Sequence, residues 1–174
     1  LEPTNEPYSI AKIAGIKLCE NYYHQYKNDF ISIMPNNLYG PNDNFDLESS
    51  HVLPALIRKF HEAKINKEEK VEIWGSGSPL REFLHVDDLA RACLFLMQNL
   101  NADQLYEKKI SHINIGSGQE ISIKELAILT KEIIGFEGEL IFNGSFPDGM
   151  PRKLLDLSVI RSLGWESSIE LKTG

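Results

Sequence analysis

Tyr8-Ser9-Ile10-Ala11-Lys12 is the stretch around which the rest of the chain is organised. Because residues four apart share one face of a helix, Tyr8 and Lys12 are expected to be neighbours. A free tyrosine loses its proton only near pH ~10. An ammonium about 4 Å away stabilises the phenolate by about 4 kcal/mol at an effective dielectric of 20. The pair therefore predicts a phenol that acts as a general acid. The alternative is a surface tyrosine and lysine on an amphipathic helix.

Apolar residues recur around this stretch at roughly helical spacing, which predicts a helix over residues 6–27. They are Ile10, Ala11, Ala14, Leu18 and Tyr22. The other expected helices cover residues 51–64, 89–100, 123–134 and 158–163. The expected strands cover residues 30–34, 71–74, 81–86, 110–115 and 139–142. Strands alternate with helices throughout, so the fold class is α/β with at least part of a parallel sheet.

Two helix starts carry capping signals. Asp87 or Asp88 is expected to cap the helix over residues 89–100, and Ser122 with Glu125 has the spacing of a capping box. Residues 36–44 are rich in Pro, Asn, Asp and Gly, which predicts a loop. Residues 101–109 are interpreted as a polar link.

Composition limits the class of partner. The 174 residues are 42% hydrophobic and 25% charged, as in a globular protein with its own core. The net charge is −7 and there is no basic block, so we do not expect a nucleic-acid partner. Phosphate recognition would then depend on a few well-placed cations.

The two cysteines, Cys19 and Cys93, have neither C-x-x-C nor metal-site spacing. They are interpreted as buried thiols in a reducing, cytoplasmic setting, and no metal is expected. No apolar run has the length of a membrane span, and no signal peptide is visible. The opening Leu1-Glu2-Pro3 is interpreted as a cut edge, so the chain is expected to be a fragment.

Two glycine pairs, Gly75-Ser76-Gly77 and Gly116-Ser117-Gly118, lack the third glycine of a dinucleotide-binding turn. Ordinary turns explain both pairs better. The glycine-rich turn that opens a nucleotide fold is therefore missing from these residues.

Three motifs follow one another along the chain. They are the Tyr8–Lys12 pair, Pro35-Asn36-Asn37-Leu38-Tyr39-Gly40-Pro41, and Arg81-Glu82-Phe83-Leu84-His85-Val86-Asp87-Asp88. Together they resemble the C-terminal half of an extended short-chain dehydrogenase/reductase that acts on a nucleotide sugar. Within that superfamily the chain is most similar to the GDP-L-fucose synthase family. The distinguishing stretches are residues 2–8, 42–45, 50–52 and 147–153.

The resemblance implies the C-terminal part of a doubly wound Rossmann-type fold with a small α/β substrate-binding lobe. Residues 1–41 and 84–118 would belong to the nucleotide-binding lobe, and residues 42–83 and 119–174 to the substrate lobe. The N-terminal half would be absent, together with the family's glycine-rich loop, its catalytic serine and its epimerisation cysteine. Cys19 and Cys93 do not match that cysteine.

The implied activity is NADPH-dependent 3,5-epimerisation and 4-reduction of GDP-4-keto-6-deoxymannose to GDP-L-fucose. A ketone at C4 acidifies the protons at C3 and C5, so inversion needs groups that remove and return protons. By resemblance His51 is one of these groups, because an imidazole titrates near neutrality. Tyr8 would protonate the C4 oxygen during reduction, and Lys12 would support Tyr8.

The resemblance also implies contacts with NADPH/NADP. Besides Lys12 and His51, they involve the residues that follow the first strand, at the end where open α/β sheets bind ligands. These are Pro35, Asn36, Asn37 and Leu38. A plain Asn-rich turn is the alternative reading of this segment.

Substrate contacts are implied for five side chains. Arg81 offers a two-pronged donor for the diphosphate. Trp74 matches a substrate contact, with a core aromatic residue as the alternative. Lys59 stands where the family often has Arg, so the positive charge is kept but the two-pronged hydrogen-bonding geometry of a guanidinium is not. Asp148 and Lys153 match contacts to guanosine or its ribose, although Pro-Asp-Gly is also a turn signal.

A homodimer through the Tyr8 helix is also implied. Two alternative functions remain open: a nucleotide-sugar 4-epimerase or 4,6-dehydratase of the same superfamily, and a non-catalytic nucleotide-sugar-binding fragment. Because the phosphate-binding turn is missing, these 174 residues alone are expected to show no reductase turnover.

Overall fold

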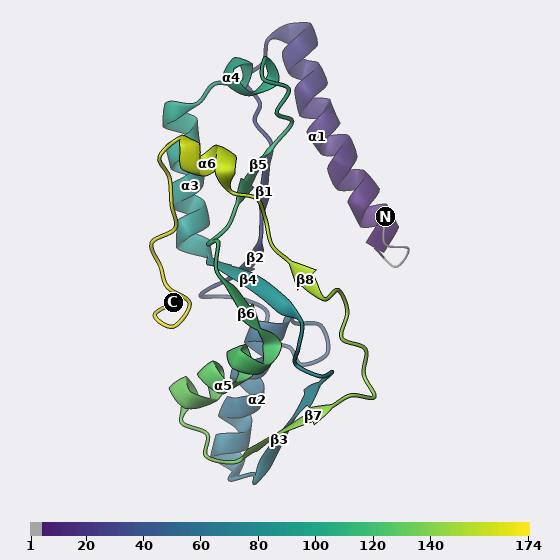
Figure 1. Ribbon diagram of the computed structural model, residues 1–174, viewed down its shortest axis with the longest axis vertical. Coiled ribbons are helices and arrows are strands. Elements are labelled where there is room, and N and C mark those ends of the chain that lie inside the picture. Colours follow the sequence, from purple (N-terminus) through teal and green to yellow (C-terminus); the bar gives the residue numbers. More distant parts are fainter. Residues whose placement is uncertain (1–4) are drawn as a thin grey trace. The chain divides into compact units, whose positions relative to one another are not determined.

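A computed structural model describes residues 5–174, and the chain divides into two compact units. Unit 1 consists of Leu1–Pro35, Leu89–Ile115 and Asp156–Glu166. Unit 2 consists of Asn36–Asp88, Gly116–Leu155 and Ser167–Gly174. The chain therefore passes between the units five times, and each unit is built from segments distant in sequence (Figure 1).

Unit 1 contains a two-stranded parallel sheet, with Ile33 of β1 opposite Ile113 of β5. Its elements are α1 (Glu6–Tyr26), β1 (Ile33–Pro35), most of α3 (Val86–Asn99), α4 (Ala102–Tyr106), β5 (Ile113–Ile115) and α6 (Ser158–Ser162). Tyr23 of α1 packs on Tyr106 of α4, with ring centroids 5.0 Å apart. The Tyr106 hydroxyl donates to the carbonyl of Phe30 (2.9 Å), which fixes α4 beside the chain that leads into β1.

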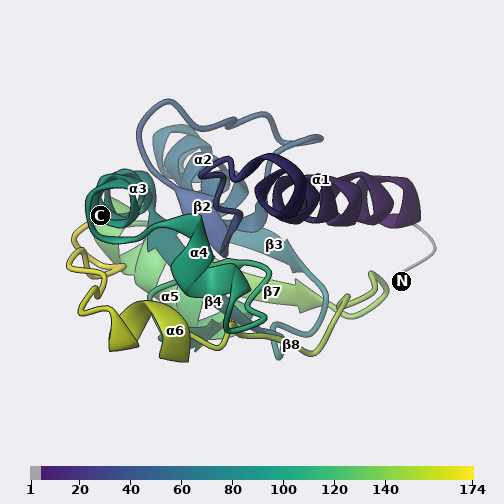
Figure 2. The same cartoon turned by 90° about the horizontal axis from the view of Figure 1, so that it is seen from above.

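Unit 2 contains the larger sheet, in which β4 is the central strand. Its elements are β2 (Asn37–Tyr39), α2 (Val52–Asn66), β3 (Lys70–Trp74), β4 (Leu80–His85), β6 (Glu120–Ser122), α5 (Ile123–Ile134), β7 (Glu139–Asn143) and β8 (Arg152–Lys153). β2 and β8 pair with β4 in parallel, and β6 pairs with it antiparallel. β3 and β7 form a separate parallel pair and run side by side in both views (Figures 1 and 2).

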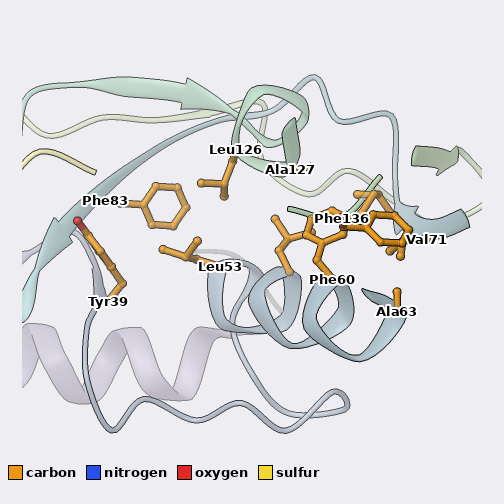
Figure 3. Close-up of a cluster of buried hydrophobic side chains, with 11 residues drawn as sticks. Tyr39, Leu53, Phe60, Ala63, Val71, Phe83, Leu126, Ala127 and Phe136 are labelled. Carbon is orange, nitrogen blue, oxygen red and sulfur yellow. The ribbon is translucent and has the colours of Figure 1, made fainter. Parts of the chain in front are cut away.

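The core of unit 2 lies between α2, α5 and these strands (Figure 3). Phe60 of α2 is fully buried and stacks on Phe136, with ring centroids 5.8 Å apart. Leu53 and Leu126 face the same cluster from α2 and α5. Burying such side chains contributes about 1.5–3 kcal/mol each, so this cluster supplies much of the stability of unit 2.

The predicted fold class is confirmed, because helices and pairs of strands follow each other along the described chain and four of the five strand pairings there are parallel. The five predicted helices are present, and the capping box is present too. The Ser122 hydroxyl accepts from the backbone N–H of Glu125 (3.1 Å), and the Glu125 carboxylate accepts from the N–H of Ser122 (2.9 Å). The proposed assignment of residue ranges to a nucleotide lobe and a substrate lobe stays a prediction.

Several local predictions were wrong. The predicted loop over residues 36–44 contains β2, and the polar link over residues 101–109 contains α4. β6 and β8 were not predicted. β2, β6 and β8 are two or three residues long and exist through pairing with β4, which local composition does not encode.

The predicted cap of the third long helix was also wrong. α3 begins at Val86, so Asp87 and Asp88 lie in its first turn rather than before it. The buried Asp88 carboxylate instead accepts hydrogen bonds from the backbone N–H groups of Ser168 and Ile169. Within residues 5–174, no helix combines the length and the apolar character needed to cross a membrane.

Candidate active site

Tyr8 and Lys12 are neighbours on α1, as their spacing predicts. The Lys12 ammonium lies 5.3 Å from the centre of the Tyr8 ring, and the Tyr8 side chain is 60% exposed. Neither side chain forms a hydrogen bond or ion pair with any other residue in the described part of the chain. The phenol and the ammonium are therefore both available to a bound ligand.

The predicted cofactor segment begins at the carboxyl end of β1 and continues into β2. Asn36 is buried, whereas Pro35, Asn37 and Leu38 are partly exposed. Asn36 donates through its side-chain nitrogen to the carboxylate of Glu82. Its side-chain oxygen accepts from the side-chain nitrogen of Asn37 (3.0 Å). The two amides are thus held in a defined orientation within unit 2.

His51 stands at the N-cap of α2, with an extended backbone (φ −73°, ψ 167°). Its carbonyl accepts from the backbone N–H of Ala55 (3.0 Å), which starts the helix. Its side chain is exposed and makes no hydrogen bond to any residue between 5 and 174. Both ring nitrogens are consequently free to exchange protons with a ligand, which the predicted acid–base role requires.

Trp74 and Phe146 form an exposed aromatic stack in unit 2, and the half-buried Lys59 lies beside it. The Trp74 ring lies parallel to the Phe146 ring, with centroids 4.6 Å apart and an interplanar angle of 12°. The Lys59 ammonium lies 4.9 Å from the centre of the Trp74 ring. Burial lowers the pKa of Lys59, and the nearby Glu72 carboxylate opposes this shift. Because Trp74 is 57% exposed, the alternative of a core aromatic residue does not hold for it.

Arg81 and Lys153 are partners across the β4–β8 pairing. Cross-strand neighbours project to the same face of a sheet, so two positive side chains stand side by side. Neither forms an ion pair with a described residue, whereas the adjacent Arg152 is paired with Glu120 (2.7 Å). Two unpaired cations in adjacent positions repel each other unless an anion lies between them. This arrangement suits a diphosphate.

Asp148 has a structural contact in addition to its predicted role in guanosine binding. One of its carboxylate oxygens accepts from the Ser76 backbone N–H (2.6 Å), and the other accepts from the Ser76 hydroxyl (2.7 Å). These hydrogen bonds hold the pKa of Asp148 below its usual value. Gly75 precedes this contact with φ +83°, and a Cβ there would collide with the carboxylate. Asp148 therefore joins residues 144–151 to the turn after β3.

The predicted site residues are distributed over both units. Tyr8, Lys12 and Pro35 belong to unit 1. The remainder belong to unit 2: Asn36, Asn37, Leu38, His51, Lys59, Trp74, Arg81, Asp148 and Lys153. Their assigned roles, and the convergence of Tyr8 and His51 on one substrate, stay predictions.

Two neighbours of the site were not singled out from the sequence. Phe146 carries the ring that stacks on Trp74, and Glu82 carries the buried carboxylate that holds Asn36. A glutamate between Arg81 and Phe83 in a predicted strand was a detectable signal, since a charged side chain on a buried strand needs partners. Phe146 lies in an irregular segment, where the sequence pattern does not predict which way a side chain points.

The donors in the chain fit a dinucleotide. The Lys12 ammonium has three N–H groups without an acidic partner among the described residues, which suits ribose hydroxyls. The Asn37 side-chain nitrogen already donates to Asn36 and Glu82, which leaves its side-chain oxygen as an acceptor. Together with the imidazole of His51 it adds polar groups that suit the nicotinamide end rather than the phosphates. These residues could hold that end, whereas no glycine-rich turn for the phosphates occurs in the sequence.

Comparison with known proteins gives consistent matches. Residues 1–116 match the model of the NAD dependent epimerase/dehydratase family. The whole chain is 60% identical to GDP-L-fucose synthase 1 of Arabidopsis thaliana, covering 52% of that protein. It is 52% identical over 176 aligned residues to GDP-L-fucose synthase of Escherichia coli, covering 55% of it. The chain thus spans about half the length of these curated relatives.

A solved structure extends the comparison. A GDP-D-glycero-L-gluco-heptose synthase from Campylobacter jejuni, crystallised in the presence of NADPH, superposes with a TM-score of 0.92 and 43% identity. The superposition covers the whole of the present chain and 59% of that protein. The fold of the chain is therefore that of a relative of known structure.

Proposed function

Because the chain belongs to the NAD dependent epimerase/dehydratase family, we propose that it is the C-terminal part of a GDP-L-fucose-forming enzyme. This enzyme epimerises GDP-4-keto-6-deoxymannose at C3 and C5 and reduces it at C4 with NADPH. The observation that carries the proposal is 60% identity to a GDP-L-fucose synthase along all 174 residues. The free imidazole of His51 and the exposed Tyr8–Lys12 pair support it.

Each residue has a defined task in this proposal. His51 exchanges protons at C3 and C5, which the C4 ketone acidifies. Tyr8 gives its proton to the C4 oxygen, and the Lys12 ammonium stabilises the resulting phenolate. NADPH, when bound, supplies the reducing equivalent at C4. Asn36, Asn37, Pro35 and Leu38 bind its nicotinamide end.

The GDP part is assigned to unit 2. Arg81 and Lys153 neutralise the diphosphate, because they present two unpaired cations on one face of the β4–β8 pairing. Trp74 and Phe146, which stack on each other beside Lys59, offer aromatic surface to the sugar or the base. The Asp148 carboxylate accepts hydrogen bonds from guanosine while it keeps its two hydrogen bonds from Ser76.

A second candidate function is reduction of a GDP-4-keto-heptose. The 44% identity to a GDP-6-OMe-4-keto-L-xylo-heptose reductase from Campylobacter jejuni favours this reading, since both substrates share the GDP group and a 4-keto sugar. A UDP-glucose 4-epimerase from Thermotoga maritima is less similar, at 28% identity and a TM-score of 0.78. The 4-epimerase and dehydratase alternatives are therefore less well supported, and the high identity to synthases also weighs against a non-catalytic fragment.

The test is turnover by the full-length protein with defined substrates. We expect NADPH oxidation with GDP-4-keto-6-deoxymannose and formation of GDP-L-fucose, identified by chromatography and NMR. Turnover with GDP-4-keto-heptose alone would transfer the assignment to the second candidate. Absence of NADPH oxidation with both substrates would refute the proposal.

Two further statements belong to the proposal. The enzyme is a homodimer that associates through α1, because this helix exposes the apolar side chains of Ile10, Ile13 and Leu18. It works in the cytoplasm, which agrees with the unpaired thiols of Cys19 and Cys93.

A further inference from the structure

A fully buried carboxylate lies beside the proposed cofactor segment. Glu82 on β4 has no solvent exposure, and its partners are all hydrogen-bond donors. They are the side-chain nitrogen of Asn36, the backbone N–H of Gly118 (2.6 Å) and the backbone N–H of Leu155 (3.3 Å). Burying a charge costs several kcal/mol unless hydrogen bonds compensate it. Three donors around one carboxylate provide that compensation.

The backbone of Gly116 lies close against this carboxylate. A Cβ at Gly116 would collide with the Glu82 carboxylate, so the turn after β5 needs a glycine there. Glu82 also has no ion-pair partner in the part of the chain that the structure describes. Its neighbour Arg81 is directed elsewhere, donating to the carbonyl of Leu80 (2.7 Å). The carboxylate is therefore bound by uncharged hydrogen-bond donors rather than by a cation.

The hydrogen bonds continue from Glu82 into the asparagine pair. Because the Asn36 nitrogen faces the carboxylate, its oxygen faces Asn37, where it accepts from the backbone N–H (2.5 Å) and the side-chain nitrogen (3.0 Å). The Asn37 side-chain nitrogen also donates to the backbone carbonyl of Glu82 (2.8 Å). One residue on β4 thus sets the orientation of both amides.

Glu82 also connects segments that are far apart in sequence. Asn36, Gly118 and Leu155 lie at or close to three of the points where the chain passes between unit 1 and unit 2. A side chain that holds these three segments fixes the start of β2, the turn after β5 and the end of the β8 segment within unit 2.

We propose that Glu82 is a positioning residue for the cofactor, acting through the Asn36–Asn37 amides. This inference rests on the proposed function, which assigns Pro35–Leu38 to the nicotinamide end. A displacement of about 1 Å at such a segment costs roughly a hundredfold in rate. Glu82 itself touches neither cofactor nor substrate in this proposal.

The central variant is Glu82→Gln in the full-length protein. The glutamine nitrogen is a donor, so it faces other donors at Asn36 or Gly118 and cannot replace the carboxylate. We expect the dissociation constant for NADPH, measured by nicotinamide fluorescence, to rise at least tenfold. Reduction should fall about a hundredfold. Solvent deuterium exchange at C3 and C5 should stay within about twofold of wild type, because epimerisation requires no transfer from the nicotinamide.

A rescue variant separates positioning from folding. In the double variant that combines Asn36→Asp with Glu82→Gln, the carboxylate and the amide exchange places, and the new amide nitrogen donates to the new carboxylate. The new amide oxygen can still accept from Gly118, and the hydrogen bond lost is the long one from the Leu155 N–H (3.3 Å). Both NADPH affinity and reduction should therefore recover to within about tenfold of wild type. Asn36→Asp alone places two carboxylates in contact and should bind NADPH more weakly than Glu82→Gln. Glu139→Gln, an exposed site on β7, is the matched control and should match wild type.

The outcomes decide whether Glu82 positions the cofactor segment or only supports folding. Unchanged NADPH affinity in Glu82→Gln, equal loss of reduction and exchange, or no recovery in the double variant would overturn the positioning role. If wild type binds NADPH but reduces no GDP-4-keto sugar, the proposed function fails. In that case the NADPH titrations of the same variants still test the inference.

Discussion

At the residue scale, the structure gives Asp148 a role beyond the contact that its motif suggests. Pro147-Asp148-Gly149 combines a turn signal with a resemblance to a guanosine contact. In the structure the carboxylate caps the turn at Ser76 through two short hydrogen bonds. In the proposed function, the Asp148 carboxylate would then both bind the nucleotide and hold its own segment, residues 144–151, in place.

This contact predicts a pH dependence. The pKa of Asp148 is lowered in the folded protein, so its stabilising contribution is complete above the unfolded value, about 3.9. It is lost as the pH falls through the lower folded value. We expect the NMR signal of the Ser76 backbone amide to be constant from pH 7 to about pH 4 and to shift below that.

The control for this titration is Asp148→Asn, which keeps the size of the side chain and removes the titrating group. The Ser76 amide signal should then show no shift in this pH range. A shift of the same size in Asp148→Asn would mean that another group causes it, and the contact would have no such influence.

The sequence predicted some contacts of the site and missed others, depending on whether the contact lies within one element or joins distant segments. The Tyr8–Lys12 proximity could be predicted because it depends only on helical spacing. The Arg81–Lys153 pairing could not, because it depends on the register between β4 and β8, which are about 70 residues apart. Glu82 was visible as a charge in a buried strand, but its partners come from three distant segments.

At the scale of elements, long helices were predictable and short strands were not. α5 carries its own start and stop signals, Ser122 with Glu125 at one end and Gly135 in the left-handed conformation at the other. β8 has two residues and no pattern of its own, so only the presence of β4 makes it a strand.

Most apolar side chains of α1 are exposed. Only Tyr23 is buried on α1, whereas Ile10 is 52% exposed and Leu18 is 58% exposed. An exposed apolar face of this kind marks a surface that another protein segment covers. The proposed dimer contact is one way to cover it.

The dimer gives a prediction for α1. In the full-length homodimer, Leu18→Glu would bury one unpaired charge per subunit in the interface, at a total cost of at least about 3 kcal/mol. The dissociation constant of the dimer should then rise roughly a hundredfold. Light scattering after size-exclusion chromatography should give the mass of a dimer for wild type and a smaller mass for the variant at micromolar concentration.

Ile65→Glu is the matched control, because Ile65 is 64% exposed on α2 and has no proposed partner. This variant should keep the mass of wild type. A dimeric Leu18→Glu variant, or a monomeric wild type, would contradict association through α1.

At the scale of the whole molecule, the chain divides the proposed chemistry between its units. Unit 1 carries the phenol and the ammonium, and unit 2 carries the imidazole and the cations for GDP. The chain spans about half the length of its curated relatives. The proposed function therefore assigns part of the cofactor site to residues outside these 174. We expect an NADPH oxidation assay on the 174-residue polypeptide alone to give no turnover.

The central claim is that Tyr8 and His51 act on the same keto-sugar with separate tasks. The most direct measurement is solvent deuterium exchange at C3 and C5, followed beside NADPH oxidation in two variants of the full-length protein. His51→Ala should lower the exchange by at least about a hundredfold. Tyr8→Phe should leave exchange within about twofold and lower reduction by at least about a hundredfold. Loss of exchange and reduction together in both variants would contradict the account.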